Sequence, residues 1–155
     1  MKRLDLQSVL KPHFIGNWNI ENKELCNKMI NFFEASPDLH IKGRTAKGVN
    51  ENIKKSIDIT INPTNLKENR FKIFDEYFSC LHECFTDYKE QFPFLKTFVN
   101  KIHIGPFNLQ KYLQGDHFGA SHSERTDITT IHRLFAWMTY LNDVDDGGTA
   151  FLYQN

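Results

Sequence analysis

The stretch that decides the fold and the chemistry of this chain is residues 108–155, NLQKYLQGDHFGASHSERTDITTIHRLFAWMTYLNDVDDGGTAFLYQN. Near its centre, His122 and Glu124 are separated by one residue. On an extended chain, residues i and i+2 point to the same face. An imidazole and a carboxylate on one face are suitable ligands for a divalent metal ion. No other histidine of the chain stands two residues before an acidic residue.

Short motifs flank this pair in a fixed order. They are Tyr112-Leu113-Gln114-Gly115 before it, and Arg133, Tyr140-Leu141-Asn142-Asp143-Val144 and Gly147-Gly148-Thr149-Ala150-Phe151 after it. Together they resemble the catalytic core of the prolyl 4-hydroxylase-like, Fe(II)- and 2-oxoglutarate-dependent dioxygenases. The Glu124 carboxylate and the closing Phe-Leu-Tyr-Gln segment are similar to short phage and bacterial members. A looser resemblance at residues 14–18, and in Lys54, Lys55, Ser56 and Asp58, extends it over most of the chain. A charged strand edge explains the latter group equally well.

The resemblance implies a role for five side chains. His122 and Glu124 would bind Fe(II), with 2-oxoglutarate as cosubstrate and ascorbate as reductant. Tyr140 would face the distal carboxylate of 2-oxoglutarate and Tyr112 the mouth of the pocket, although two ordinary core tyrosines remain the alternative. Thr149 would line the pocket. Its alignment with the family's motif is left open, because the Gly-Gly-Thr motif is one residue shorter than in some relatives.

Two parts of the family's site lack a counterpart in this sequence. The resemblance implies a second histidine ligand well downstream and a Lys or Arg shortly after it, but no histidine follows His132. We expect His132 to begin the next strand, His117 to be a variable residue of the pocket wall, and Arg133 to be structural. The chain is therefore expected to end before the distal histidine and the last strands of its own barrel.

Helical and extended patterns divide the chain in two. Apolar spacing predicts a helix over residues 20–34 and a longer one over residues 71–88. Alternation predicts a strand over residues 57–61, and short extended segments are expected over residues 99–104 and 109–113. Apolar residues on both faces predict a strand sandwiched between layers over residues 133–141. Helices followed by strands indicate an α+β domain. The resemblance specifies a single domain, residues 1–155, with helical support over about 1–98 packed on a double-stranded β-helix, or jelly roll, over about 99–155.

Composition limits the other classes of function. Lys plus Arg equals Asp plus Glu at 19 each, so the net charge is zero and no nucleic-acid or membrane binding is expected. Cys26, Cys80 and Cys84 are an odd number for a disulfide framework, and the helical pattern around the last two favours buried thiols over a metal site. We expect a reduced cytoplasmic location, in the host if the protein is phage-encoded.

Three hypotheses of function follow. The first is an Fe(II)- and 2-oxoglutarate-dependent dioxygenase that hydroxylates a C–H bond of a peptide, protein or small molecule, with peptidyl proline as the substrate suggested by analogy. The second is a truncated, inactive fragment of such an enzyme. The third is a cupin-like binding module without redox chemistry. The sequence does not specify the substrate or the oligomeric state.

Overall fold

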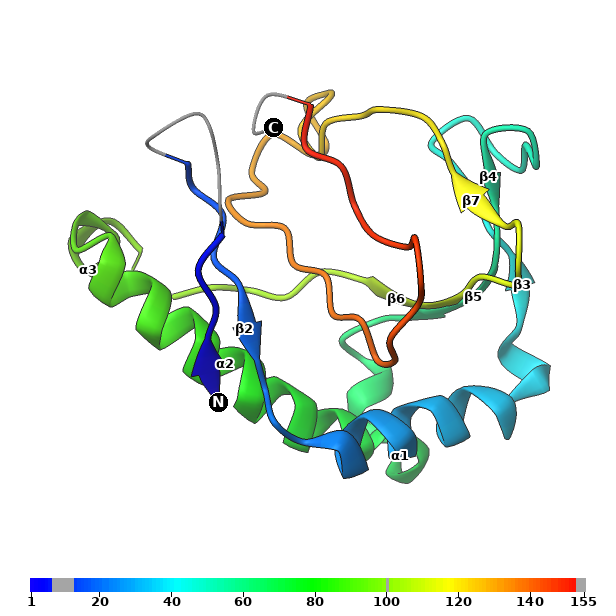
Figure 1. Ribbon diagram of the computed structural model, residues 1–155, viewed down its shortest axis with the longest axis horizontal. Helices are drawn as coiled ribbons and strands as arrows, with labels where there is room; N and C mark the ends of the chain where they lie inside the picture. Colours follow the sequence, from blue (N-terminus) through cyan, green and yellow to red (C-terminus); the bar gives the residue numbers. More distant parts are fainter. Residues whose placement is uncertain (7–12, 100, 153–155) are drawn as a thin grey trace. The chain divides into compact units, whose positions relative to one another are not determined.

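The computed structural model describes residues 1–6, 13–99 and 101–152, which form two compact units. Unit 1 comprises residues 1–30, 63–105 and 141–155, and unit 2 comprises residues 31–62 and 106–140. Helices and small antiparallel sheets occur together, so the α+β class is confirmed (Figure 1). The prediction of a single domain stays a prediction.

Unit 1 is built on helix α2, Ile73–Gln91, which matches the predicted long helix. Its buried face carries Phe74, Tyr77 and Cys84, whereas Phe78, Leu81 and Phe85 of the predicted aromatic stripe are only half-buried. The buried face of α2 is therefore rotated about the helix axis from the face that the spacing of the phenylalanines alone indicated. Pro93 precedes the short helix α3, Phe94–Phe98, because a proline fits the first turn of a helix but not its interior.

The N-terminal hairpin of unit 1 lies along α2 (Figure 1). Strands β1, Lys2–Arg3, and β2, Trp18–Asn19, pair antiparallel. The Trp18 indole donates to Asp87 Oδ2 at 2.7 Å, and the Arg3 guanidinium lies 3.1 Å from the same oxygen. The Asp87 carboxylate of α2 thus binds both strands of the hairpin to the helix.

Helix α1, Lys23–Glu34, begins three residues later than predicted. Asn22 caps it, since its side-chain oxygen accepts a hydrogen bond from the Leu25 backbone N–H at 3.0 Å. Leu25 and Met29 are buried in unit 1, and Phe33 is buried in unit 2. The helical spacing of its apolar residues therefore identified the buried face correctly.

Unit 2 is organised around strand β5, Ile57–Ile61, whose bounds match the prediction. It pairs antiparallel with β3, Ile41–Lys42, on one side and with β6, Phe107–Lys111, on the other. A second ladder joins β4, Lys54–Lys55, to β7, His117–Phe118. Ile59 and Ile61 are fully buried on one face of β5, and Asp58 lies on the other.

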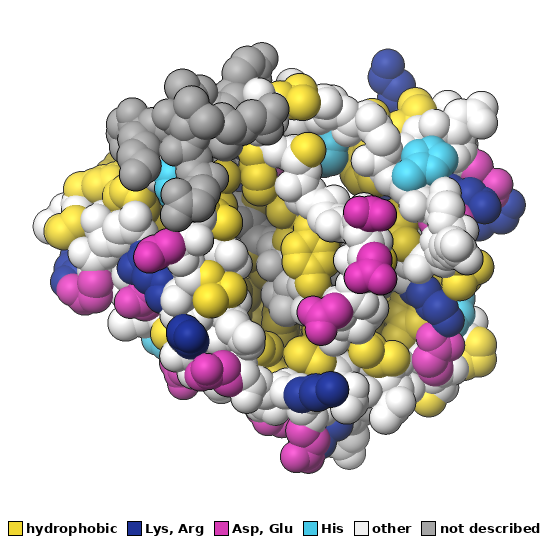
Figure 2. All heavy atoms as spheres, in the orientation of Figure 1, with side chains coloured by type: hydrophobic (Ala, Val, Ile, Leu, Met, Phe, Trp, Pro, Cys, Tyr) yellow, Lys and Arg dark blue, Asp and Glu magenta, His cyan; other side chains and the backbone are white. Residues whose placement is uncertain are grey.

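Several strands expected from the resemblance are not seen in the described part of the chain. The described strands form three separate sheets of two, three and two strands, and residues 101–104 and 133–141 have no regular secondary structure. A strand requires a partner edge for its backbone groups, and no ladder reaches these residues. Burial alternates within residues 133–141: Phe135 and Trp137 are half-buried, while Leu134 and Met138 are exposed. Figure 2 shows hydrophobic side chains at the surface.

Three short 3-10 turns complete the described elements. They are η1 at Pro37–Leu39, η2 at Asn65–Lys67 and η3 at Asn69–Phe71. Within residues 45–50, Thr45 and Gly48 close a turn. None of the helices in the described ranges has the length and apolar composition required to span a bilayer.

Candidate functional site

The predicted metal ligands lie together in unit 2, on an irregular segment that follows β7. His122 Nε2 is 3.6 Å from Glu124 Oε1. His122 Nδ1 lies 3.0 Å from the carbonyl oxygen of Ala120. A carbonyl can only accept, so this hydrogen bond requires the proton on Nδ1; in the neutral imidazole the lone pair is then on Nε2. That tautomer is the one in which Nε2 can bind a metal ion.

The separation of the two donor atoms also fits a shared ion. Metal–nitrogen and metal–oxygen bonds of this kind are about 2.0–2.2 Å long, so one ion can bridge donors separated by up to about 4.2 Å. Both side chains are 48% exposed, which leaves the remaining metal positions accessible. Among residues 1–6, 13–99 and 101–152, no group of three or more His, Cys, Asp or Glu side chains is arranged to hold a metal. The pair offers two candidate donor atoms, His122 Nε2 and Glu124 Oε1.

Arg133 contacts the same carboxylate. Its guanidinium donates to Glu124 Oε2 at 2.9 Å, while Oε1 faces His122. The sequence prediction of a structural role for Arg133 did not include this partner. The ion pair with Arg133 holds Glu124 Oε2 and leaves Oε1 available to a metal ion.

The other histidines of this region do not join the pair. Strand alternation places His117 on the face of β7 opposite Phe118, where its ring nitrogen lies 3.3 Å from the Asn52 carbonyl. His132 is exposed in a turn and does not begin a strand, contrary to prediction. Neither histidine contacts the pair, and the expected place of His117 in the pocket wall stays a prediction.

A buried polar network lies on the face of β5 and β6 that carries Asp58. Lys54 Nζ is 2.6 Å from Asp58 Oδ2, and both side chains are 3–4% exposed. Ser56 donates to Asp58 Oδ1 at 2.7 Å, and Gln110, opposite Asp58 in the ladder, donates to Oδ2 at 3.2 Å. Gly43 is packed against this network: a Cβ there would lie 2.1 Å from Ser56 Oγ. Sequence reasoning singled out Lys54, Ser56 and Asp58 but did not foresee their burial.

The two candidate tyrosines approach one another beside this network. The Tyr112 hydroxyl donates to Gln110 Oε1 at 3.3 Å. Burial raises the pKa of Tyr112, the Asp58 carboxylate and the nearby Tyr140 raise it further, and a hydrogen bond with Ser56 lowers it. Tyr112 is 41% exposed and Tyr140 63%, so neither is the ordinary core tyrosine of the alternative interpretation.

A pH titration is expected to identify Tyr112 by its late ionisation. Because its pKa is raised in the folded state, the associated stability is present below the pKa of an unfolded tyrosine, about 10, and is lost as pH rises through the folded value. The measurement is phenolate absorbance of the wild type minus that of Tyr112→Phe. A difference curve centred at the value of an unfolded tyrosine would contradict this environment.

Thr149, the last predicted site residue, is exposed and belongs to unit 1. It follows the predicted tight turn, in which Asp146 and Gly148 have φ of +55° and +146°. The latter favours glycine because a Cβ is poorly tolerated there. The turn is confirmed; the proposed role of Thr149 in the pocket stays a prediction.

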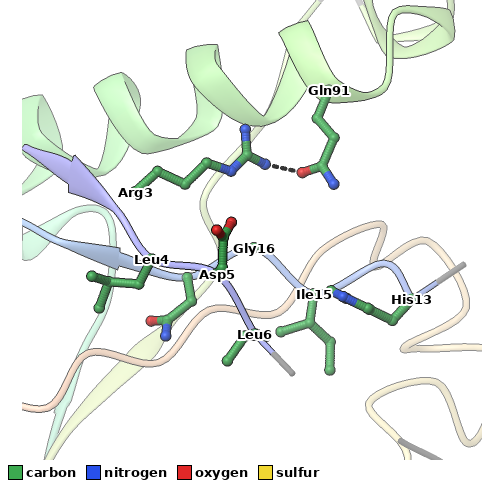
Figure 3. Close-up of a pocket in the computed structure, with 9 residues that line it drawn as sticks. Arg3, Leu4, Asp5, Leu6, His13, Ile15, Gly16 and Gln91 are labelled. Atoms are coloured by element: carbon green, nitrogen blue, oxygen red, sulfur yellow. Dashed lines mark hydrogen bonds between the residues drawn. The ribbon is translucent and has the colours of Figure 1, made fainter. Parts of the chain in front are cut away.

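Two further features of unit 1 lie outside the predicted site. A polar pocket of about 280 Å³ is lined by residues that include Arg3, Asp5 and His13, and Arg3 donates to Gln91 beside it (Figure 3). The cysteines form no disulfide, and burial raises the pKa of Cys80 and Cys84 on α2, as expected for unreactive thiols.

Comparisons with protein-family models, curated proteins and solved structures returned no match to this chain.

Proposed function

We propose that the protein is an Fe(II)- and 2-oxoglutarate-dependent dioxygenase that hydroxylates a C–H bond. The observation that carries the proposal is the His122–Glu124 pair, in which Nε2 and Oε1 lie 3.6 Å apart while Nδ1 is hydrogen-bonded to the Ala120 carbonyl. A nitrogen and a carboxylate oxygen with open positions beside them suit Fe(II) among the divalent ions. The resemblance in sequence implies the type of reaction, and the short distance between the two donor atoms would allow the pair to bind a metal ion.

Each residue of the site has a role in this proposal. His122 and Glu124 would hold the iron, and Arg133 would keep the carboxylate oriented. Tyr112 and Tyr140, which interact electrostatically, would donate hydrogen bonds to a carboxylate of 2-oxoglutarate, and Tyr112 would exchange its present acceptor, Gln110 Oε1, for it. The bound metal and cosubstrate supply the oxidising power, and the protein supplies position and selectivity. Thr149 and ascorbate keep the roles that the resemblance implies.

The same proposal includes the finer features of the family. We propose a double-stranded β-helix around the site, a peptide, protein or small-molecule substrate with peptidyl proline as the leading choice, and a cytoplasmic location. The antiparallel pairing of β5 with β6 and of β4 with β7 supports the first of these, since a jelly roll is assembled from such ladders.

A second candidate function is a metal-binding module without redox turnover, either as an inactive fragment of such an enzyme or as a cupin-like protein. It is favoured by one observation: in the described part of the chain, no third His, Cys, Asp or Glu joins the pair. Metal binding without any response to 2-oxoglutarate would support it.

The test is release of succinate from 2-oxoglutarate in the presence of Fe(II), dioxygen and ascorbate. We expect the wild type to exceed the protein-free rate and His122→Ala to fall to it, because the ligand is lost. His117→Ala changes a histidine of β7 that is not a proposed metal ligand, and it should retain most of the wild-type rate. Equal rates for wild type and His122→Ala would contradict the proposal.

A further inference from the structure

We propose that Phe118, seated on the buried Lys54–Asp58 ion pair, positions the imidazole of His122 for metal binding. The inference deepens the proposed function and rests on it for the role of His122. Phe118 and Lys54 would be positioning residues, since neither touches the metal.

Strand pairing sets the first contact. In the β4–β7 ladder, Lys54 stands directly opposite Phe118, and Lys55 stands opposite His117. Residues opposite one another share a face, so Lys54 meets Phe118 on one side of the ladder. The Gly119 backbone N–H donates to the Ile53 carbonyl at 2.9 Å, which continues the pairing beyond β7. The register therefore determines which side chain lies against Phe118.

The buried ion pair then holds the lysine in place. Lys54 Nζ lies 5.6 Å from the centre of the Phe118 ring, within the range of a cation–π contact. Asp58 holds the same ammonium at 2.6 Å, and Ser56 and Gln110 hold Asp58. With its side chain 3% exposed, Lys54 has little freedom to leave the ring.

Phe118 in turn supports the metal ligand. Its ring and the His122 imidazole are stacked, with centroids 4.5 Å apart and an angle of 17° between their planes. The stack fixes the plane of the imidazole, and the hydrogen bond from Nδ1 to Ala120 fixes the rotation within that plane. Nε2 is then directed to the side on which Glu124 lies. An otherwise irregular segment thus gains a defined ligand geometry.

The network also joins the two halves of the candidate site. Contacts run from Tyr112 through Gln110 and Asp58 to Lys54, and from there through Phe118 to His122. The same ion pair can therefore orient a cosubstrate-binding hydroxyl and a metal-binding ring. This explains why a charged pair is kept in a buried position, where desolvation makes it costly.

The experiment compares Phe118→Leu, Phe118→Tyr and His117→Ala in the full chain. Two quantities are measured: the chemical shifts of the His122 ring protons without metal, and the Kd for Co²⁺ as the probe. Phe118 is 38% exposed, so its replacement by leucine is expected to leave the fold intact, as circular dichroism would verify. His117→Ala is the matched control, because it changes the other face of the same strand.

We expect Phe118→Leu to move the His122 ring protons downfield, through loss of ring-current shielding, and to raise the Kd for Co²⁺ about 10- to 100-fold, the usual effect of losing a group that orients a ligand. Phe118→Tyr, which keeps the ring, should restore both values, and His117→Ala should change neither. Unchanged shifts, or shifted protons with an unchanged Kd, would overturn the positioning role. If wild type and His122→Ala bind Co²⁺ equally, the proposed metal site fails, and with it this inference.

Discussion

Replacement of Asp58 by asparagine is expected to lower the free energy of unfolding by about 3–5 kcal/mol, because it leaves the Lys54 ammonium buried without a counter-charge. Both side chains are 3–4% exposed, and the lysine has no access to water to compensate. For a chain of this size the loss corresponds to a fall in Tm of about 6–20 °C. Urea denaturation followed by circular dichroism measures it.

A matched control is available in the same unit. Lys111 and Glu34 also form an ion pair at 2.6 Å, but their side chains are 38% and 52% exposed. Glu34→Gln is expected to lower the free energy of unfolding by about 0–1 kcal/mol, as for other surface pairs. The two pairs share their distance and differ in burial, so the comparison isolates desolvation. A loss below about 1 kcal/mol for Asp58→Asn would mean that the pair is not buried as described.

A further variant, Lys54→Met/Asp58→Leu, removes both charges of the buried pair. Removing both charges leaves no unpaired ion, and we expect the double variant to recover most of the stability that Asp58→Asn loses. Stability would then be retained without the cation beneath Phe118. A stable double variant with weakened Co²⁺ binding would separate the structural role of the ion pair from its proposed role in positioning His122.

The local elements of the fold were predictable because their signals are local. Helix α2 and strand β5 follow from apolar residues at helical and alternating spacing. The buried face of α2 differs in part from the phenylalanine spacing, because the structure buries Tyr77 and leaves Phe78 and Phe85 half-buried; the burial of Cys84 agrees with the prediction of buried thiols. Caps and boundaries, such as Asn22 before α1, required only short-range chemistry.

The arrangement around the site could not be read from spacing alone. The i, i+2 argument assumed an extended strand, but the segment that carries His122 and Glu124 is not a strand; the two side chains nevertheless lie 3.6 Å apart. The stack of His122 on Phe118 and the ion pair between Lys54 and Asp58 each join residues four positions apart. The contact between Lys54 and Phe118 that links them depends on strand register, which joins residues more than 60 positions apart in β4 and β7. Arg133 and Glu124 meet through a turn that no apolar pattern specifies.

Loss of either predicted ligand is expected to have the largest effect on metal binding. Removing a group that merely orients a ligand weakens binding about 10- to 100-fold, so removing the ligand itself should weaken it by at least about 100-fold. Glu124→Gln keeps the size of the side chain but removes the charge, and His122→Ala removes the imidazole. His132→Ala, an exposed histidine of the same unit, serves as the control.

The most direct test of the metal site is therefore a calorimetric titration of Co²⁺ into the wild type and these three variants. We predict binding by the wild type and by His132→Ala, and a loss of at least about 100-fold in affinity for both His122→Ala and Glu124→Gln. Wild-type affinity in His122→Ala and Glu124→Gln would contradict the assignment of this pair as a metal site.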